Sequence, residues 1–177
     1  MRPIHLVRLG NVDRALIDRV RLAVMREYRV ACRLDAQQLD PAFAFHPERG
    51  QYHSTTIIQR LAAMDRAETV VGITQVDLFI PILTYVFGEA QMNGSSAVVS
   101  FHRFAQEFYG LPADPSLLAA RLSKTVVHEI GHTAGLTHCD DYDCVMAASH
   151  SVEYLDLKGV SLCAACLASL HSSAAVR

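Results

Sequence analysis

Apolar residues recur along the chain at two spacings, one typical of strands and the other of helices. Short apolar runs predict five strands, at residues 4–9, 28–34, 69–75, 83–87 and 97–101. The run at 83–87 is short and flanked by turn residues, so we expect it at the edge of the sheet. Apolar positions at three- and four-residue steps predict helices from a cap at Asn11 or Asp13 to about Glu27, and over 51–64.

A third helix is predicted from Asp114-Pro115 to about Ala134. Aspartate caps helix N-termini, and proline suits the first helical position because its missing N–H would have no partner there. Gly135 follows the last apolar position and ends the helix.

Alternating strands and helices over the first hundred residues predict an α/β fold, a mixed twisted sheet with helices packed on it. The length of 177 residues suits a single domain that can bury a core. Within that domain, residues 1–137 hold the sheet and the third helix, and residues 138–177 form a cysteine-rich subdomain.

Charge and composition indicate which kinds of binding partner and which cellular compartment to expect. The formal net charge of −2, without long basic runs, gives no basis for binding nucleic acid or an anionic membrane. No apolar run reaches the eighteen residues of a spanning helix, and the N-terminus (MRPIHLVRLG) lacks the apolar region of a signal peptide. We therefore predict a cytoplasmic monomer, in a compartment where disulfides are rare.

The segment VHEIGHTAGLTHC, residues 127–139, holds the clearest candidate metal-binding residues in the sequence. His128 and His132 are four residues apart on the third helix, so both imidazoles lie on one face and can reach one ion. Glu129 lies beside that face, where a carboxylate can take the proton of a metal-bound water. Gly135 permits a sharp turn, after which His138 can return as the third ligand.

This spacing, HExxHxxGxxH, predicts a catalytic zinc with three protein ligands and one position open to water. It resembles the metzincin signature, which a downstream methionine turn completes, and Met146 is the candidate for that turn. The alternative is three histidines with structural roles. It would leave unexplained why a helix start, a helix stop and a nearby cysteine cluster all agree with the site.

Four of the five cysteines form two close pairs, Cys139 with Cys144 and Cys163 with Cys166, separated by 18 residues. Two such pairs predict a structural zinc held by four thiolates. Two disulfides or free core cysteines are the alternatives. Cys32 lies apart on a predicted strand and is interpreted as a core residue.

The segments HEIGHTAGLTHC, CVM and CAAC resemble the archaemetzincins, a metallopeptidase-like family of the metzincin clan. VVGITQVDLF, TYVFGEAQMNG and SAVVSFHRF are similar to the same family upstream. The resemblance implies a mainly parallel sheet with one antiparallel edge strand above a cleft. It also implies a set of roles: catalytic zinc ligands His128, His132 and His138, general base Glu129, Met-turn residue Met146, and a second zinc on Cys139, Cys144, Cys163 and Cys166.

The leading hypothesis is a zinc-dependent peptidase acting on short peptides or unfolded segments, with two zinc ions per chain. Glu89, on the predicted edge, could receive a substrate amine as in an aminopeptidase, or could be an exposed edge charge. Asp156 could hydrogen-bond a ligand histidine, or could serve in a loop or cap. The alternative function is a zinc-stabilised peptide-binding or regulatory module with little turnover, which would have no need of Glu129.

Overall fold

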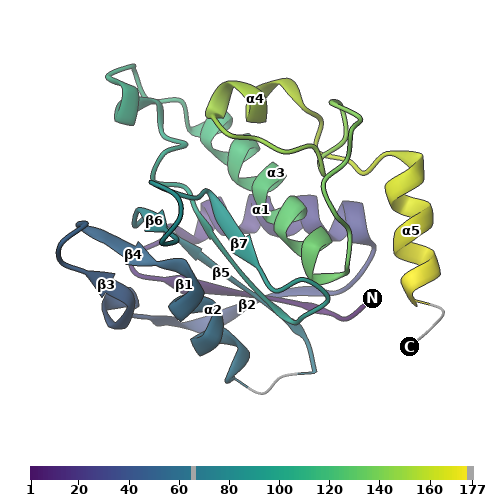
Figure 1. Cartoon of the computed structure of the whole chain (residues 1–177), viewed down its shortest axis with the longest axis horizontal. Helices are drawn as coiled ribbons and strands as arrows, with labels where there is room; N and C mark the ends of the chain where they lie inside the picture. The colour runs from purple at the N-terminus through teal and green to yellow at the C-terminus, as the bar shows by residue number, and fades with distance from the viewer. Residues whose placement is uncertain (65–66, 175–177) are drawn as a thin grey trace.

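The structure is a computed structural model that describes residues 1–64 and 67–174 (Figure 1). None of the described helices is both long enough and apolar enough to cross a membrane. The elements in chain order are β1 (Ile4–Leu9), α1 (Arg14–Tyr28), β2 (Cys32–Leu39), the 3-10 helix η1 (Pro41–Ala44), β3 (Phe45–His46), β4 (Gln51–His53), α2 (Ser54–Ala62), β5 (Thr69–Thr74), β6 (Leu78–Phe79), β7 (Gly88–Ala90), β8 (Ser96–Ser100), the 3-10 helix η2 (Gln106–Tyr109), α3 (Pro115–Thr133), α4 (Val152–Leu157) and α5 (Ala164–Ala174).

A five-stranded sheet in the order β2-β1-β5-β8-β7 forms the centre of the fold. The first four strands in this order are mutually parallel, and β7 pairs antiparallel with β8 at one edge. All six residues of β5 are buried, as expected of a central strand covered on both faces. The mixed sheet with one antiparallel edge strand confirms the predicted fold class.

Helices cover both faces of this sheet, α1 and α3 on one side and α2 on the other (Figure 1). The side chains of β1 point to both faces of the sheet, so this strand contributes to the packing on each side. Ile4 and Leu6 pack with α1 and α3, whereas Val7 and Leu9 pack with α2. Leucines from the C-terminal region belong to the α1–α3 core, namely Leu155, Leu162 and Leu170. The segment that carries the cysteines therefore shares its core with the sheet.

The predicted strand at residues 28–34 starts too early. Tyr28 is the last residue of α1, Arg29 caps that helix in the left-handed conformation (φ 52°), and β2 begins only at Cys32. The buried Tyr28 hydroxyl donates a hydrogen bond to the Val127 carbonyl of α3 at 2.6 Å. This contact with a distant helix holds Tyr28 in α1 against its strand preference.

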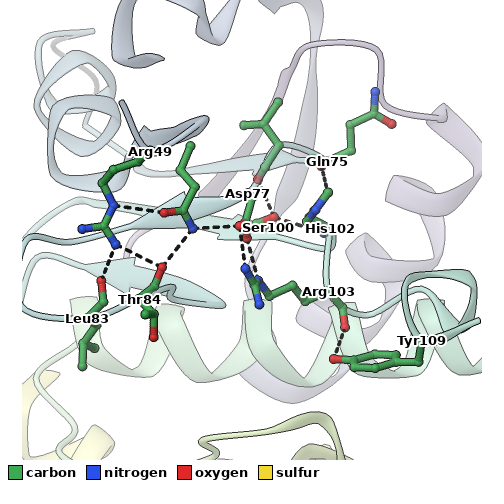
Figure 2. A network of polar contacts seen from close by, with 11 residues as sticks. Arg49, Gln75, Asp77, Leu83, Thr84, Ser100, His102, Arg103 and Tyr109 are labelled. Atoms are coloured by element: carbon green, nitrogen blue, oxygen red, sulfur yellow. Dashed lines mark hydrogen bonds and ion pairs between the residues drawn. The ribbon is translucent and has the colours of Figure 1, made fainter. Parts of the chain in front are cut away.

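The predicted edge strand at residues 83–87 is wrong. Val86 forms only an isolated bridge with Leu78, and the edge strand is β7, which starts at Gly88. Figure 2 shows the reason: the Arg49 guanidinium donates to the carbonyls of Leu83 and Thr84, at 3.0 and 3.2 Å. Because these two carbonyls accept hydrogen bonds from side chains, they do not pair with a neighbouring strand. The helix expected over 51–64 is also shorter, because its first three residues form β4.

Replacing Tyr28 by phenylalanine tests the contact between α1 and α3. Tyr28→Phe removes one buried hydrogen bond, so the free energy of unfolding should fall by about 0.5–1.5 kcal/mol. Urea denaturation measures this change. Tyr142→Phe is the matched control, because the Tyr142 side chain is 85% exposed and its loss of a hydroxyl should change nothing. Equal stability of the two variants would contradict the role given to Tyr28.

Candidate active site

The last two turns of α3 present the polar groups of the site. Asp114 caps this helix, its carboxylate accepting hydrogen bonds from the backbone N–H groups of Ser116 and Leu117. The helix then packs against α1 and one face of the sheet, so that His128 and Glu129 are only 7% and 6% exposed. Polar side chains placed so deep need partners or a function.

Gly135 ends the helix as the spacing predicted. Its φ of +98° lies in the region that favours glycine, and the Leu136 N–H bonds back to the Gly131 carbonyl at 2.9 Å. Asn93, in the loop after β7, reinforces the turn by donating its N–H to the His132 carbonyl at 3.2 Å. The chain is thereby reversed, and His138 comes to lie beside His128 and His132.

The three imidazoles converge on a common centre, with one nitrogen of each facing the other two. His128 Nδ1 lies 2.8 Å from the Val145 carbonyl, and His132 Nδ1 lies 2.7 Å from the Leu136 carbonyl. A carbonyl only accepts, so each Nδ1 carries the proton and each Nε2 keeps its lone pair. These two Nε2 atoms are 3.0 Å apart, and one nitrogen of each histidine lies within 4.8 Å of the others.

The protonation of these histidines suits a metal. Burial, together with the Lys158 charge, lowers the pKa of His128 to about 3. Burial also lowers the pKa of His132 and of His138. All three rings are therefore neutral at physiological pH. Lone pairs brought so close repel one another unless a cation lies among them, so the residues fit a zinc ion with three nitrogen ligands.

Glu129 lies at the edge of this centre against β7. A side chain at Gly88 would place its Cβ 2.7 Å from Glu129 Oε1, so only glycine lets the edge strand approach so closely. Burial raises the pKa of Glu129 to about 8, with a contribution from the charge of Glu89 and against the opposing charge of Lys158. A carboxyl group in this range is suited to proton transfer near neutral pH.

Met146, the predicted Met-turn residue, lies beside the part of α3 that carries His128 and His132. It is fully buried, and its sulfur packs against Gly131 in the middle of the HExxH segment. The turn that carries Met146 is hydrogen-bonded to Cys139, the residue after His138, because the Cys139 N–H donates to the Met146 carbonyl at 3.0 Å.

The four cysteines of the C-terminal region gather in a second cluster, with all sulfurs within 4.8 Å of one another. The Sγ distances of 3.8 Å for Cys139–Cys163 and for Cys144–Cys166 exceed a disulfide bond, and all four cysteines are free. Thiolates about 2.3 Å from a tetrahedral zinc lie about 3.8 Å apart, which matches this cluster. The structure thus favours the zinc alternative over disulfides, and it places Cys32 in the core.

A cleft of about 600 Å³ opens over the histidines, and its walls include Gly88, Glu89 and residues 83–87. Tyr85 reaches across to donate its hydroxyl hydrogen to the His150 carbonyl at 3.0 Å. A larger cavity of about 1170 Å³ lies behind this wall, and Figure 2 shows the polar network there. In that network the Arg103 guanidinium donates to the Asp77 carboxylate and stacks on the Tyr85 ring. These contacts hold Tyr85 in the wall of the cleft.

Two residues have roles that the sequence did not indicate. Of the alternatives open for Asp156, a hydrogen bond to one of the three histidines is not found; its carboxylate accepts two hydrogen bonds from the Arg121 guanidinium, at 2.8 and 2.6 Å. Lys158 was missed altogether, although it is 4% exposed and lines the cleft beside the histidines. It follows α4 with no motif around it, so no spacing in the sequence could have indicated it.

Comparisons with known sequences agree with this geometry. The profile of peptidase family M54 matches residues 14–172. The archaemetzincin of Methanocaldococcus jannaschii is 42% identical over 131 residues, which span 74% of this chain and 72% of that protein. The archaemetzincin of Haloquadratum walsbyi is 33% identical over 166 residues, spanning 92% of this chain and 96% of that protein.

Solved structures show the same fold. A zinc-dependent peptidase from Methanocorpusculum labreanum superposes with a TM-score of 0.88 at 29% identity, covering 95% of this chain and all of that one. The archaemetzincin of Methanopyrus kandleri gives a TM-score of 0.86 at 32% identity, covering 98% of this chain and 96% of that one. The chain therefore belongs to peptidase family M54, the archaemetzincins, and is a zinc metallopeptidase.

Proposed function

We propose that His128, His132 and His138 hold the catalytic zinc, the first two through Nε2, and that Glu129 is the general base. The observation that carries this proposal is the orientation of the rings: carbonyls hold the Nδ1 atoms of His128 and His132, which leaves the Nε2 lone pairs facing one another at 3.0 Å. When bound, zinc supplies Lewis-acid chemistry, lowering the pKa of a water and polarising the scissile carbonyl.

The protein supplies the proton transfer. The Glu129 carboxylate takes a proton from the attacking water and passes it to the nitrogen of the leaving amine. Its burial excludes bulk water, and its contact with β7 fixes its position relative to a bound substrate.

The proposed substrate is an extended short peptide or an unfolded segment. β7 is the last strand of its sheet and lines the cleft with Gly88 and Glu89. A peptide lying along this edge can pair with its free backbone groups, which selects extended chains and not folded proteins. The cleft volume of about 600 Å³ fits a few residues.

Aminopeptidase-like action is the finer proposal. Glu89 lines the cleft, and the Thr55 hydroxyl donates to its Oε1 at 2.9 Å, with Ser54 as a second hydroxyl donor. Both donors stand at the start of α2, where the helix dipole also favours a negative charge. A carboxylate held in the cleft in this way can receive the ammonium group of a peptide N-terminus.

We further propose that the cysteine cluster holds a second, structural zinc. Backbone N–H groups of Cys163 and Met146 lie 3.3 and 3.4 Å from Cys144 Sγ, and such donors stabilise a thiolate. The same ion would join the Met-turn to α5, because Cys163 and Cys166 lie at the start of that helix.

Elemental analysis tests the two metals. Wild type should bind two zinc ions per chain and His132→Ala one, with little loss of stability. Cys144→Ser should lose the other zinc and melt at a lower temperature, because a structural zinc contributes directly to the folding free energy. One zinc in both wild type and His132→Ala would rule out a stable three-histidine site and favour the binding-module alternative.

Glu129→Gln tests the general base. The substitution keeps the shape of the side chain and removes its basicity, so kcat should fall by about 100- to 10,000-fold with zinc content unchanged. Cleavage of a mixed peptide library, followed by mass spectrometry, measures the loss. A Glu129→Gln protein as active as wild type would refute the assignment.

Free and N-acetylated forms of one short peptide test the aminopeptidase proposal. If Glu89 binds the terminal ammonium, acetylation or Glu89→Gln should each lower kcat/KM by about 10- to 100-fold, the value of a hydrogen bond between charged groups. Glu107→Gln, an exposed carboxylate in η2, is the control. Equal cleavage of both peptides would indicate endopeptidase action.

A further inference from the structure

Lys158 is a buried cation for which the mechanism above has no use. It follows α4, and its side chain turns inward, where the residue is only 4% exposed. Its Nζ donates hydrogen bonds to the carbonyls of Val145 and Ala147, at 2.8 and 2.7 Å. These two carbonyls flank Met146, so a single ammonium group holds the Met-turn from both sides.

The Val145 carbonyl connects Lys158 to the histidines. It accepts from His128 Nδ1 at 2.8 Å as well as from Lys158 Nζ. The position of this oxygen therefore decides the orientation of the His128 ring, and hence where Nε2 points. Lys158 Nζ lies 3.5 Å from His128 Nδ1, which carries its own proton, so the two groups converge on the same oxygen.

The backbone of Lys158 is fixed by the cysteine-rich region. The Gly159 N–H donates to the Asp143 carbonyl, and the Val145 N–H donates to the Ser161 carbonyl, both at 2.9 Å. Residues 158–161 thus run alongside the Met-turn, and the lysine side chain enters the interior from this fixed position.

The charge of Lys158 carries a cost that its hydrogen bonds must offset. Burying an ammonium group is unfavourable, and a cation beside the three histidines repels a metal ion. The opposite charges that face it are those of Glu129, in the histidine site, and of Cys144, in the cysteine cluster. An apolar side chain of the same length would avoid both costs, but it would leave the Val145 and Ala147 carbonyls without this donor.

We infer that Lys158 is a positioning residue of the zinc site: its ammonium group fixes the Val145–Ala147 turn, so that the Val145 carbonyl holds His128 Nε2 toward the metal. This inference rests on the proposed three-histidine zinc site. Lys158 touches neither metal nor substrate in this role; it acts through His128, as outer hydrogen-bond partners of metal ligands do.

Metal affinity in Lys158→Met tests the inference. Methionine keeps the length of the side chain and removes its donors, so the three-histidine site should bind zinc about 10- to 100-fold more weakly. Chelator competition measures this, with the four-cysteine zinc as an internal reference that should not change. Visible absorption of Co²⁺ bound at the histidines reports the ligand geometry without any need for activity.

Lys124→Met is the matched control. The Lys124 Nζ also donates to two backbone carbonyls, those of Leu155 and Asp156, at 3.0 and 3.1 Å, but neither belongs to the Met-turn. The zinc affinity of the three-histidine site in Lys124→Met should equal that in wild type. If Lys158→Met does not fold, Lys158→Gln is measured in the same way. Glutamine keeps an amide NH2 group but has a shorter side chain and no charge, so this variant should also bind zinc more weakly.

The outcomes separate the two proposals. Wild type that binds no metal at the histidines would refute the zinc site, and the role of Lys158 with it. Wild type that binds metal, with Lys158 variants that bind equally or more tightly, would refute the positioning role alone; tighter binding would mean that charge repulsion is the main effect of Lys158.

Discussion

Two backbone carbonyls, those of Val145 and Leu136, decide the chemistry of this protein. Each accepts the Nδ1 proton of a histidine, and each thereby turns an Nε2 lone pair toward the same point. Placing several lone pairs together in a buried site is unfavourable without a cation. The arrangement persists because the surrounding fold holds the carbonyls in place: Leu136 by the turn at Gly135, and Val145 by the Met-turn.

The sheet contributes to the site through its antiparallel edge. β7 approaches α3 so closely that the Gly88 backbone contacts the Glu129 carboxyl group. The same strand presents its outer edge to the cleft, so the proposed base and the proposed substrate track are set by one short element. The side chains of Arg49 and Gln51 bind the Thr84 carbonyl in the segment before β7, and this segment forms another part of the cleft wall.

The histidine and cysteine clusters are structurally continuous. His138 and Cys139 are adjacent, and the Cys139 N–H bonds the Met146 carbonyl between the two clusters. Cys144 lies one residue before Val145, whose carbonyl orients His128. A metal at the cysteines would therefore stiffen the backbone that orients His128, while Lys158 donates to the Val145 and Ala147 carbonyls of the same turn. A change that destabilises the cysteine-rich region should therefore also change the geometry of the histidine site.

Local patterns in the sequence determined much of the fold and most of the candidate site. β1, β5 and α3 follow from periodicity and from Asp114 and Pro115, and Gly135 marks the turn, because each depends on neighbours within a few residues. The grouping of three histidines and of four cysteines follows from spacing for the same reason.

Only the tertiary structure decided the rest. Tyr28 stays helical because its hydroxyl bonds α3, and residues 83–87 do not form a strand because Arg49 binds the carbonyls of Leu83 and Thr84. The Asp156 carboxylate accepts from Arg121 and not from a histidine. Lys158 meets the Met-turn only after the chain has folded back on itself. In each case the partner lies more than ten residues away, and a contact at that distance leaves no periodic trace in the sequence.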